Sequence, residues 1–381
     1  MRELSLYVHI PFCVRKCLYC DFLSFSVADK REKINSYVNL LAKEIGMWKE
    51  ACKDRTVVSI FFGGGTPSLL EGDEMEFLME QIRESFVLTK DAEITMEMNP
   101  GTVSRESLIA YRRAGISRVS IGLQSARDEE LKAIGRIHTY AEFQECFAWA
   151  RQAGFENINI DLMAALPGQD IASYRNTLEK AVALSPEHIS SYSLILEEGT
   201  FLYDRQDDYR FPTEDEEREM YDLTEEILQN AGYHRYEISN YAKAGYECRH
   251  NKVYWQRGDY LGLGLGASSM MDNRRWKNFS GAEEYRRYVE DREALGGLSV
   301  QTLTVQEQME EFMFLGLRLT NGVSAREFAA CFGTELESVY GEVFKRHYRQ
   351  KTMQKNGDRI CLTKRGMDVS NYVMADFLFD S

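Results

Sequence analysis

Short runs rich in apolar and β-branched residues alternate with longer amphipathic segments along the first half of the chain. The short runs cover residues 4–10, 57–63, 92–98, 118–124, 157–163 and 188–194, and the longer segments cover 33–48, 72–86, 104–115, 139–154 and 173–185. The first kind of pattern predicts buried strands and the second predicts helices. Regular alternation of the two predicts a parallel sheet covered by helices. Six units are too few for a closed eight-unit barrel, so we predict a partial (β/α)6 barrel that is open on one side.

Polar and glycine-rich residues follow the predicted strands at their carboxyl ends. GGGTP follows the second strand, EMNPG the third, LQS the fourth and DLMAALPGQ the fifth. In β/α barrels this end of the strands is where sites are built. Glycine and proline alone would indicate only turns. Glu97, Gln124 and Asp161 are not turn formers of that kind, and they favour a site.

The pattern changes after about residue 200. Residues 213–232 predict an acidic helix, 235–242 a strand, and the glycine- and aromatic-rich stretch 248–270 a loop. From about residue 300 the pattern predicts helices and a small β-wing, which is a winged-helix-like arrangement. We therefore expect a partial barrel over 1–210, a barrel extension over 211–300 and a C-terminal helical, winged-helix-like domain over 301–381. Acidic and basic residues roughly balance in the last part, which favours a structural or substrate-covering role over DNA binding.

Composition narrows the class of protein. The 381 residues are 44% apolar and 28% charged, as in ordinary globular proteins. A net charge of −14 argues against binding to nucleic acid, because an acidic surface repels phosphates. No apolar run reaches the roughly 18 residues of a transmembrane helix, and the N-terminus does not read as a signal peptide. We expect a cytoplasmic protein.

Three of the eight cysteines lie in one short window, LYVHIPFCVRKCLYCDF, at positions 13, 17 and 20. Three thiolates can hold three irons of a [4Fe–4S] cluster and leave the fourth iron open to a small chelating ligand. The amino and carboxylate groups of S-adenosylmethionine (SAM) suit that position. There are two alternatives: a structural zinc site with His9 as a fourth ligand, or a redox pair of Cys17 and Cys20. No second CxxC pair supports zinc, and the redox reading leaves Cys13 without a role.

The window HIPFCVRKCLYCDF, together with FFGGGTPSLL, resembles the radical SAM superfamily. YVHIPFC, the segment AIGRIHT and DLMAALPGQ resemble the oxygen-independent coproporphyrinogen III oxidase family within it, over nearly the whole chain. The resemblance implies that Cys13, Cys17 and Cys20 bind a [4Fe–4S] cluster, whose electron would cleave SAM to a 5′-deoxyadenosyl radical. It also implies a SAM site made of Tyr7, Tyr19, Gly64, Gly65, Thr66, Glu97, Gln124, Arg136 and Asp161. One departure is Ala164-Ala165, where relatives often carry an aromatic residue and a glycine.

Two further departures bear on function. The oxidases carry another cysteine two places after the third ligand, where this chain has Phe22, and a longer segment before the cysteine motif, where this chain has twelve residues. Both features resemble the haem chaperone branch, HemW. That branch carries a HNxxYW motif, which here is HNKVYW at 250–255. An imidazole can bind haem iron and aromatic rings can pack on a porphyrin, so His250 is a candidate haem-binding residue. Without the resemblance, these residues read as ordinary core aromatics and a hydrogen-bonded histidine.

The resemblance to the branch implies a protein that holds a [4Fe–4S] cluster, SAM and haem and transfers haem to apo-haemoproteins, including respiratory ones. Flavodoxin or ferredoxin is the kind of reductant it implies. The alternative is an enzyme that decarboxylates coproporphyrinogen III by radical chemistry, and a third hypothesis is a radical enzyme that opens the haem ring. We therefore assign no catalytic residue from the sequence.

Overall fold

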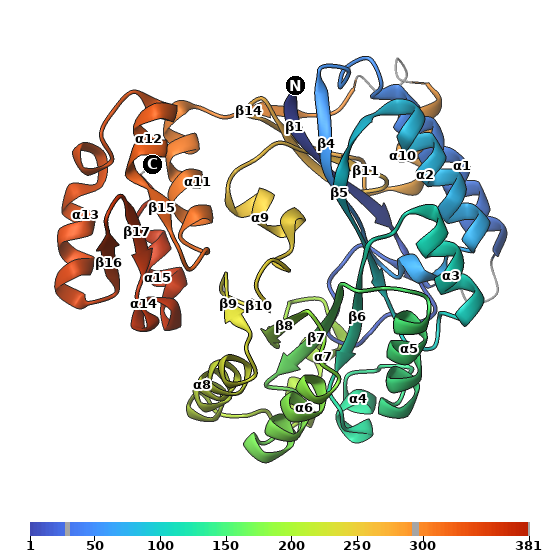
Figure 1. Cartoon of the computed structure of the whole chain (residues 1–381), viewed down its shortest axis with the longest axis horizontal. Helices are drawn as coiled ribbons and strands as arrows, with labels where there is room; N and C mark the ends of the chain where they lie inside the picture. The colour runs from blue at the N-terminus through green and yellow to red at the C-terminus, as the bar shows by residue number, and fades with distance from the viewer. Residues whose placement is uncertain (27–30, 292–296, 380–381) are drawn as a thin grey trace.

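The structure is a computed structural model of the chain, and it describes residues 1–26, 31–291 and 297–379. Within these residues the main sheet has 12 strands in the order β14-β13-β12-β11-β1-β4-β5-β6-β7-β8-β10-β9. Its parallel part consists of β11 (Tyr260–Leu263), β1 (Arg2–Ile10), β4 (Arg55–Gly64), β5 (Val87–Met98), β6 (Arg118–Gln124), β7 (Ile158–Ala164) and β8 (His188–Ser193). The six predicted strands are present and lie side by side in chain order, and the sheet curves into an open partial barrel (Figure 1).

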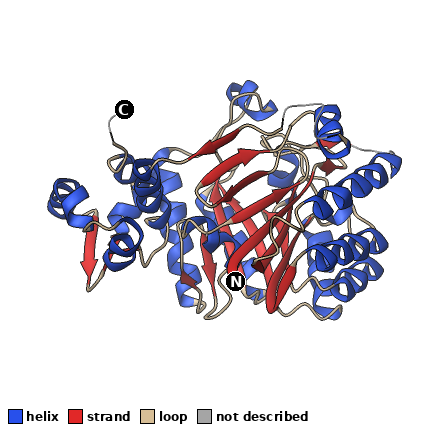
Figure 2. Cartoon of the chain, turned by 90° about the horizontal axis from the view of Figure 1, so that it is seen from above, coloured by secondary structure: helices blue, strands red, loops and turns tan. Residues whose placement is uncertain are grey.

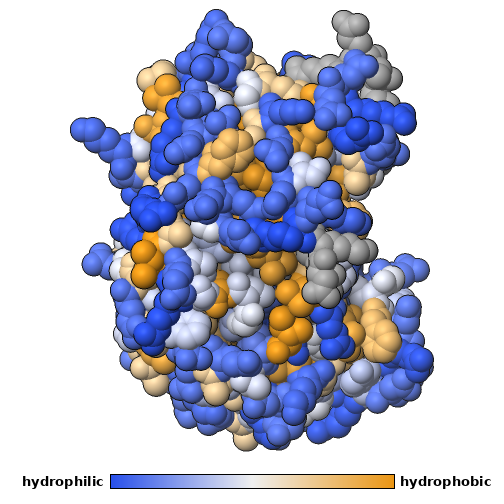
Figure 3. Space-filling view, turned by 90° about the vertical axis from the view of Figure 1, so that its right-hand side faces the viewer, coloured by the Kyte–Doolittle hydropathy of each residue, from blue (hydrophilic) through white to orange (hydrophobic). Residues whose placement is uncertain are grey.

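Helices cover the outside of this sheet (Figure 2). They are α1 (Arg31–Met47), α2 (Gly72–Ser85), α3 (Arg105–Ala114), α4 (Asp128–Ala133), α5 (Tyr140–Gln152), α6 (Ile171–Ala183) and α8 (Glu214–Asn230). The short helix α7 (Phe201–Asp204) instead contacts the loop after β1, where the N–H of Leu202 donates to the carbonyl of Leu18. The sequence contains the signals that start and end several of them. Thr213 forms a capping box with Glu216 at the start of the acidic helix α8, and Gly115 ends α3 in a left-handed conformation. The outward face of the helical layer is largely hydrophilic, with small hydrophobic patches (Figure 3).

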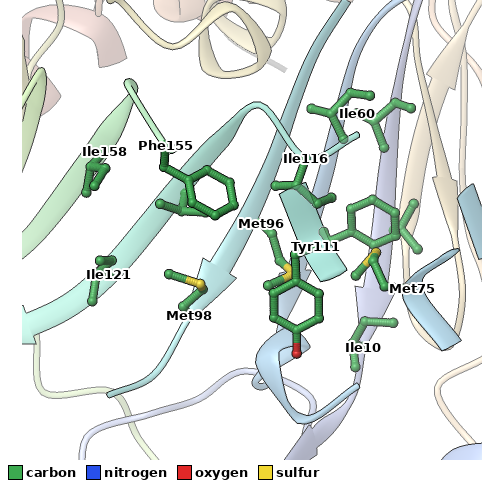
Figure 4. Close-up of a cluster of buried hydrophobic side chains, with 14 of the residues drawn as sticks. Ile10, Ile60, Met75, Met96, Met98, Tyr111, Ile116, Ile121, Phe155 and Ile158 are labelled. Carbon is green, nitrogen blue, oxygen red and sulfur yellow. The ribbon is translucent and has the colours of Figure 1, made fainter. Parts of the chain in front are cut away.

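The strands of the barrel alternate between apolar residues that face the helices and polar or aromatic residues that face inward. On β1, Leu4, Leu6, Val8 and Ile10 are buried in the main hydrophobic core. Side chains such as Ile60, Met96, Ile121 and Ile158 continue this core under the helices (Figure 4). Successive strand residues point to opposite faces, so the same alternation leaves the intervening residues inside the barrel. The hydrophobic core therefore lies outside the strands, and the barrel interior is left for other chemistry.

The prediction of a loop over 248–270 is wrong. This stretch contains the helix α9 (Arg249–Trp255) and the strand β11, which pairs parallel to β1 and adds a seventh parallel strand to the six predicted. The antiparallel strands β12 (Ser268–Met271), β13 (Arg274–Lys277) and β14 (Val300–Thr302) extend this edge, and α10 (Ala282–Glu290) follows β13. The glycines are needed for close packing: a Cβ on Gly262 would lie 2.2 Å from the carbonyl oxygen of Ser268. At the other edge, the single strand predicted over 235–242 is two short strands, β9 (His234–Arg235) and β10 (Asn240–Ala242).

The C-terminal residues form the predicted helical, winged-helix-like arrangement around a hydrophobic cluster that includes Phe328, Phe344 and Phe377. Its helices are α11 (Val305–Gly316), α12 (Ala325–Phe332), α13 (Leu336–Gln350), α14 (Lys364–Asp368) and α15 (Ser370–Ala375). The wing is the sheet β15 (Val323–Ser324), β17 (Arg359–Leu362) and β16 (Met353–Asn356). The predicted boundaries near residues 210 and 300 stay predictions. Among the described residues, no helix combines the length and apolar character that crossing a membrane requires.

Candidate functional site

The three-cysteine window follows β1 as a loop at the carboxyl end of the barrel strands. The short strand β2 (Phe12–Cys13) pairs with β3 (Phe25–Ser26), and the backbone N–H of Phe25 donates to the carbonyl of Pro11 at 2.8 Å, which closes the loop. Cys13 is buried, whereas Cys17 and Cys20 are half-buried, and all three are free thiols. All three line one cavity of about 340 Å³, here called the upper chamber. Burial is the main cause that raises the pKa of the Cys20 thiol to about 11.

The glycine-rich end of β4 packs directly on the cysteine loop. The N–H of Gly65 donates to the carbonyl of Ile10 at 2.9 Å, and that of Thr66 donates to the carbonyl of Phe12 at 2.7 Å. The Thr66 hydroxyl also donates to the Cys13 sulfur at 3.5 Å. Gly64 has a φ of +106°, a conformation that residues with a Cβ rarely adopt. The glycines thus hold the first cysteine through backbone contacts.

Eight of the nine residues predicted to contact SAM meet in the upper chamber. They are Tyr19, Gly64, Gly65, Thr66, Glu97, Gln124, Arg136 and Asp161. Arg136 donates to the Cys17 sulfur at 3.7 Å and to the carbonyl of Gly122 at 2.7 Å, and it also contacts the side-chain oxygen of Asn99. Its guanidinium therefore connects one thiol to the strand ends. Gln124 ends β6 with a φ of +67°, which is the kind of backbone strain that gathers at functional sites.

A second cavity, of about 500 Å³, adjoins the first and is here called the lower chamber. It shares wall residues with the upper chamber, namely Phe22, Gly64, Glu97, Ser120, Asp161 and Tyr192. Tyr7, the ninth residue predicted for SAM, lines this lower chamber and is absent from the lining of the upper one. His250, Asn251 and Tyr254 of the HNxxYW motif line it as well. The structure therefore brings the cysteine motif and the HNxxYW motif to two adjoining cavities.

His250 is held firmly in the wall of the lower chamber. Its ring nitrogens are within hydrogen-bond distance of the Ser59 hydroxyl (Nδ1, 2.9 Å) and the Tyr254 hydroxyl (Nε2, 2.9 Å), and the residue is only 1% exposed. Its ring lies 5.2 Å from that of Phe61. Burial, helped by the charge of Arg118, lowers the pKa of His250 to about 3, so the imidazole is neutral at physiological pH. Trp255, the last residue of the motif, instead packs under Arg318 near the C-terminal helices.

Two acidic side chains, Glu97 and Asp161, form part of both chamber walls. Glu97 accepts a hydrogen bond from the N–H of Gly64 at 3.1 Å, and Asp161 accepts from Ser120 and Asn159, each at 2.8 Å. Burial, with a smaller contribution from the nearby Asp161, raises the pKa of Glu97 to about 8. Burial also raises the pKa of Asp161. Acids of this kind can hold hydroxyl and amino groups of a ligand without attracting bulk water.

Sequence reasoning missed most of the polar network beneath the site. Asn159 hydrogen-bonds Ser120, Ser190 and His188, and the other ring nitrogen of His188 lies 2.9 Å from the Tyr236 hydroxyl. The alternation of residues along adjacent strands places these side chains on the inward face, and that pattern could have predicted them. The Ala164-Ala165 departure does not touch the lining of either chamber. Ala165 has a φ of +60°, which explains why a glycine would suit this position.

Glu97 makes the stability of the ligand-free protein depend on pH. Between its ordinary pKa of 4.5 and the folded value of about 8, the folded protein keeps a proton that the unfolded chain has released. Stability therefore falls as pH rises through this window, and the full cost of the buried charge is present above pH 8. We expect the Glu97→Gln variant and the wild type to have the same free energy of unfolding near pH 5. At pH 9 the free energy of unfolding of the variant should be higher by roughly 2 kcal/mol, after allowance for screening. Urea unfolding at the two pH values, with the exposed Glu50→Gln as control, tests this; equal curves at pH 9 would contradict it.

Comparison with known proteins agrees with this geometry. The family model for the radical SAM superfamily matches residues 7–181, and that for the HemN C-terminal domain matches 303–369. A protein named "Heme chaperone HemW" from Lactococcus lactis is 36% identical over 378 residues, which is 99% of this chain and 97% of that protein. A protein of the same name from Bacillus subtilis is 35% identical over 377 residues, covering 98% of this chain and 99% of that protein. The chain belongs to the HemW family.

The fold of this HemW-family chain also has a solved relative. The coproporphyrinogen III oxidase HemN from Escherichia coli, described as a radical SAM enzyme, superposes with a TM-score of 0.86 and covers 99% of this chain and 90% of that one. At 24% identity this likeness shows the shared fold. The predicted radical SAM partial barrel and the C-terminal domain are thereby confirmed.

Membership of the radical SAM superfamily implies a [4Fe–4S] cluster and SAM, and the donor set here fits both. The three thiols all line the upper chamber. Among residues 1–26, 31–291 and 297–379, no three His, Cys, Asp or Glu side chains gather around a single-ion position. A cube held through three of its irons takes one thiolate on each iron, which differs from three ligands on a single ion. Gly64, Glu97 and Asp161 supply backbone and carboxylate contacts next to the thiols for an amino acid and a nucleoside.

Proposed function

We propose that this chain is a haem chaperone that holds a [4Fe–4S] cluster, SAM and haem and passes the haem to apo-haemoproteins. The observation that carries the proposal is the adjacency of the two chambers, one lined by Cys13, Cys17 and Cys20 and the other by His250 and Tyr254. The name "Heme chaperone HemW", borne by relatives from several bacteria, supports haem as the cargo.

Each chamber would have its own ligand. In the upper chamber the three thiols would hold the cluster, and the residues at the strand ends would orient SAM beside it. When bound, the cluster supplies an electron that can cleave the carbon–sulfur bond of SAM. In the lower chamber the rings of Phe61, Tyr254 and Tyr260 give flat apolar walls, which suit a porphyrin. Glu97 and Asp161 line both chambers and would lie between the two ligands.

Phe22 distinguishes this proposal from oxidase chemistry. It occupies the place where the resemblance to oxidases would require a further cysteine, it is 60% exposed, and it lines both chambers. A large apolar ring at the junction suits a bound porphyrin face but supplies no redox group. The alternative function, oxidative decarboxylation of coproporphyrinogen III, is favoured by the HemN fold alone. We further propose a cytoplasmic location, respiratory apo-haemoproteins among the recipients, and flavodoxin or ferredoxin as the reductant.

One experiment separates the two functions. The full chain is reconstituted anaerobically with iron and sulfide, and it is then given haem or, separately, coproporphyrinogen III with SAM and a reductant. We expect stoichiometric haem binding, transfer to an apo-cytochrome, and no protoporphyrinogen. Turnover to protoporphyrinogen, or failure to retain haem, would overturn the proposal.

His250→Ala tests the role of the HNxxYW motif. The change removes a ring from the chamber wall and leaves the hydroxyls of Ser59 and Tyr254 without their partner, so we expect haem affinity to fall roughly ten-fold or more while cluster iron is unchanged. Absorbance titration with haem and iron analysis measure the two effects. The matched control is His234→Ala, an exposed histidine paired with Glu247. If His250→Ala took up haem as the wild type does, the motif would have no role in haem binding.

A further inference from the structure

Arg118 has an unusual environment for a cation. It begins β6, is only 2% exposed, and lines the lower chamber. Among the described residues its guanidinium has no hydrogen bond or salt bridge, and its Nε is fully buried without a partner. A guanidinium offers five N–H donors, and a buried donor left unpaired is costly. An acceptor from outside the chain would relieve this cost.

The nearby acidic side chains are already engaged by other donors. Glu93 accepts from the N–H groups of Arg249 (3.1 Å) and His250 (3.2 Å) at the start of α9, and from the Cys248 thiol. Asp161 uses its two oxygens for Ser120 and Asn159. Both carboxylates lower the energy of the Arg118 charge through the local field, but neither fills its directional donor sites. Arg118 thus keeps unpartnered donors while it lines the lower chamber.

The chamber that Arg118 lines has aromatic side chains in its walls. The rings of Tyr7 and Phe61 are stacked with centroids 6.4 Å apart, and Tyr254 and Tyr260 meet edge-to-face at 4.7 Å. Its volume of about 500 Å³ lies within the range of roughly 300–1,000 Å³ of small-molecule sites. Lys277, which is exposed, adds a second positive charge to the lining. A carboxylate carried on an aromatic ring system matches both the walls and the buried guanidinium.

We propose that Arg118 is a binding residue for a carboxylate of the porphyrin, so that one haem propionate points into the barrel and is held by the guanidinium in a two-pronged pair. The inference rests on the proposed function, because haem is taken as the occupant of the lower chamber. Guanidinium and carboxylate form two parallel N–H···O bonds, which are among the stronger hydrogen bonds in proteins. The pair would also fix which edge of the haem enters first.

The test compares haem with haem dimethyl ester, in which both propionates are masked. Both ligands are titrated anaerobically into the reconstituted full chain, its Arg118→Gln variant and its Arg118→Lys variant. The wild type should bind haem roughly ten-fold or more tightly than the diester. Arg118→Gln should weaken haem binding and leave diester binding unchanged, so that the preference for haem is lost. Arg118→Lys should retain part of this preference. The matched control, Arg127→Gln, removes one positive charge from an exposed position and should keep the preference intact.

Each result is decisive. Equal affinity of the wild type for the two ligands, or an Arg118→Gln variant that weakens both equally, overturns the propionate contact while leaving haem binding in place. Failure of the wild type to bind either ligand overturns the proposed function and the contact together. Should Arg118→Gln not fold, as judged by thermal melting and iron content, the wild-type comparison and Arg118→Lys still decide the question.

Discussion

Replacing Cys13, Cys17 and Cys20 together with alanine is expected to abolish the iron–sulfur cluster and, with it, tight binding of SAM. The three thiols line the same chamber, and among the residues that the structure describes no other cysteine lines either chamber. A cube with three protein ligands cannot be held once all three are lost, so iron and sulfide should fall from about four each per chain to background. Anaerobic reconstitution followed by iron and sulfide analysis and absorbance spectroscopy measures this.

The control for this experiment is Cys331→Ala, which removes an exposed thiol far along the chain in α12. It should retain the full cluster. The two proteins should also melt at similar temperatures in the metal-free state, because the cysteine loop is held mainly by backbone hydrogen bonds. Wild-type protein that takes up zinc in place of iron and sulfide would contradict the cluster assignment and the functions built on it.

Gly65→Ala is expected to disrupt the same site through sterics alone. A Cβ at this position would lie 2.6 Å from the carbonyl oxygen of Phe12, 2.7 Å from its nitrogen and 2.8 Å from the carbonyl oxygen of Ile10. All three atoms belong to the backbone, so the cysteine loop itself must move. We expect a loss of roughly 1–3 kcal/mol in stability and at least a ten-fold loss in SAM affinity. Urea unfolding and isothermal titration with SAM are the measurements.

Gly46→Ala provides the matched control, because a Cβ there meets no atom within 4 Å and the residue lies inside the helix α1. It should keep SAM affinity and gain slightly in stability, since alanine favours the helix over glycine. If Gly65→Ala bound SAM as tightly as the wild type, the close backbone packing between the glycine loop and the cysteine loop would have no part in the site.

Local sequence pattern was sufficient to predict the partial barrel. The run LSLYVHI places Leu4, Leu6, Val8 and Ile10 on one face of β1, and similar runs mark the other five strands. The strand β11 was not predicted because Gly262 and Gly264 resemble turn residues in the sequence. Tertiary contacts explain why glycine is required at both positions. Gly262 lies against the backbone of Ser268, and Gly264 lies against the hydroxyl of Tyr37. Glycine at a close contact and glycine in a turn look alike until the partner is known.

The buried Glu44 illustrates the same limit away from the site. It lies on α1, where an acidic residue usually faces water, yet it accepts hydrogen bonds from the N–H of Gly264, from Asn278 and from Tyr285. These partners are more than 200 positions away in sequence. No local pattern distinguishes it from Glu32, the exposed acid on the same helix.

The chemistry that depends on residue type and short spacing was determined by the sequence itself. Three cysteines at positions 13, 17 and 20, the glycines at 63–65 and the strand-end acids indicated where a cluster and its nucleotide partner would lie, because neighbours in sequence stay neighbours in a loop. Only the tertiary structure placed the HNxxYW helix beside Tyr7, joined the two chambers through Glu97 and Asp161, and left Arg118 facing a cavity with no partner among the described residues. The inward face of a barrel is assembled from strands far apart in the chain, so its contacts and its unmet hydrogen bonds exist only once the sheet has closed around them.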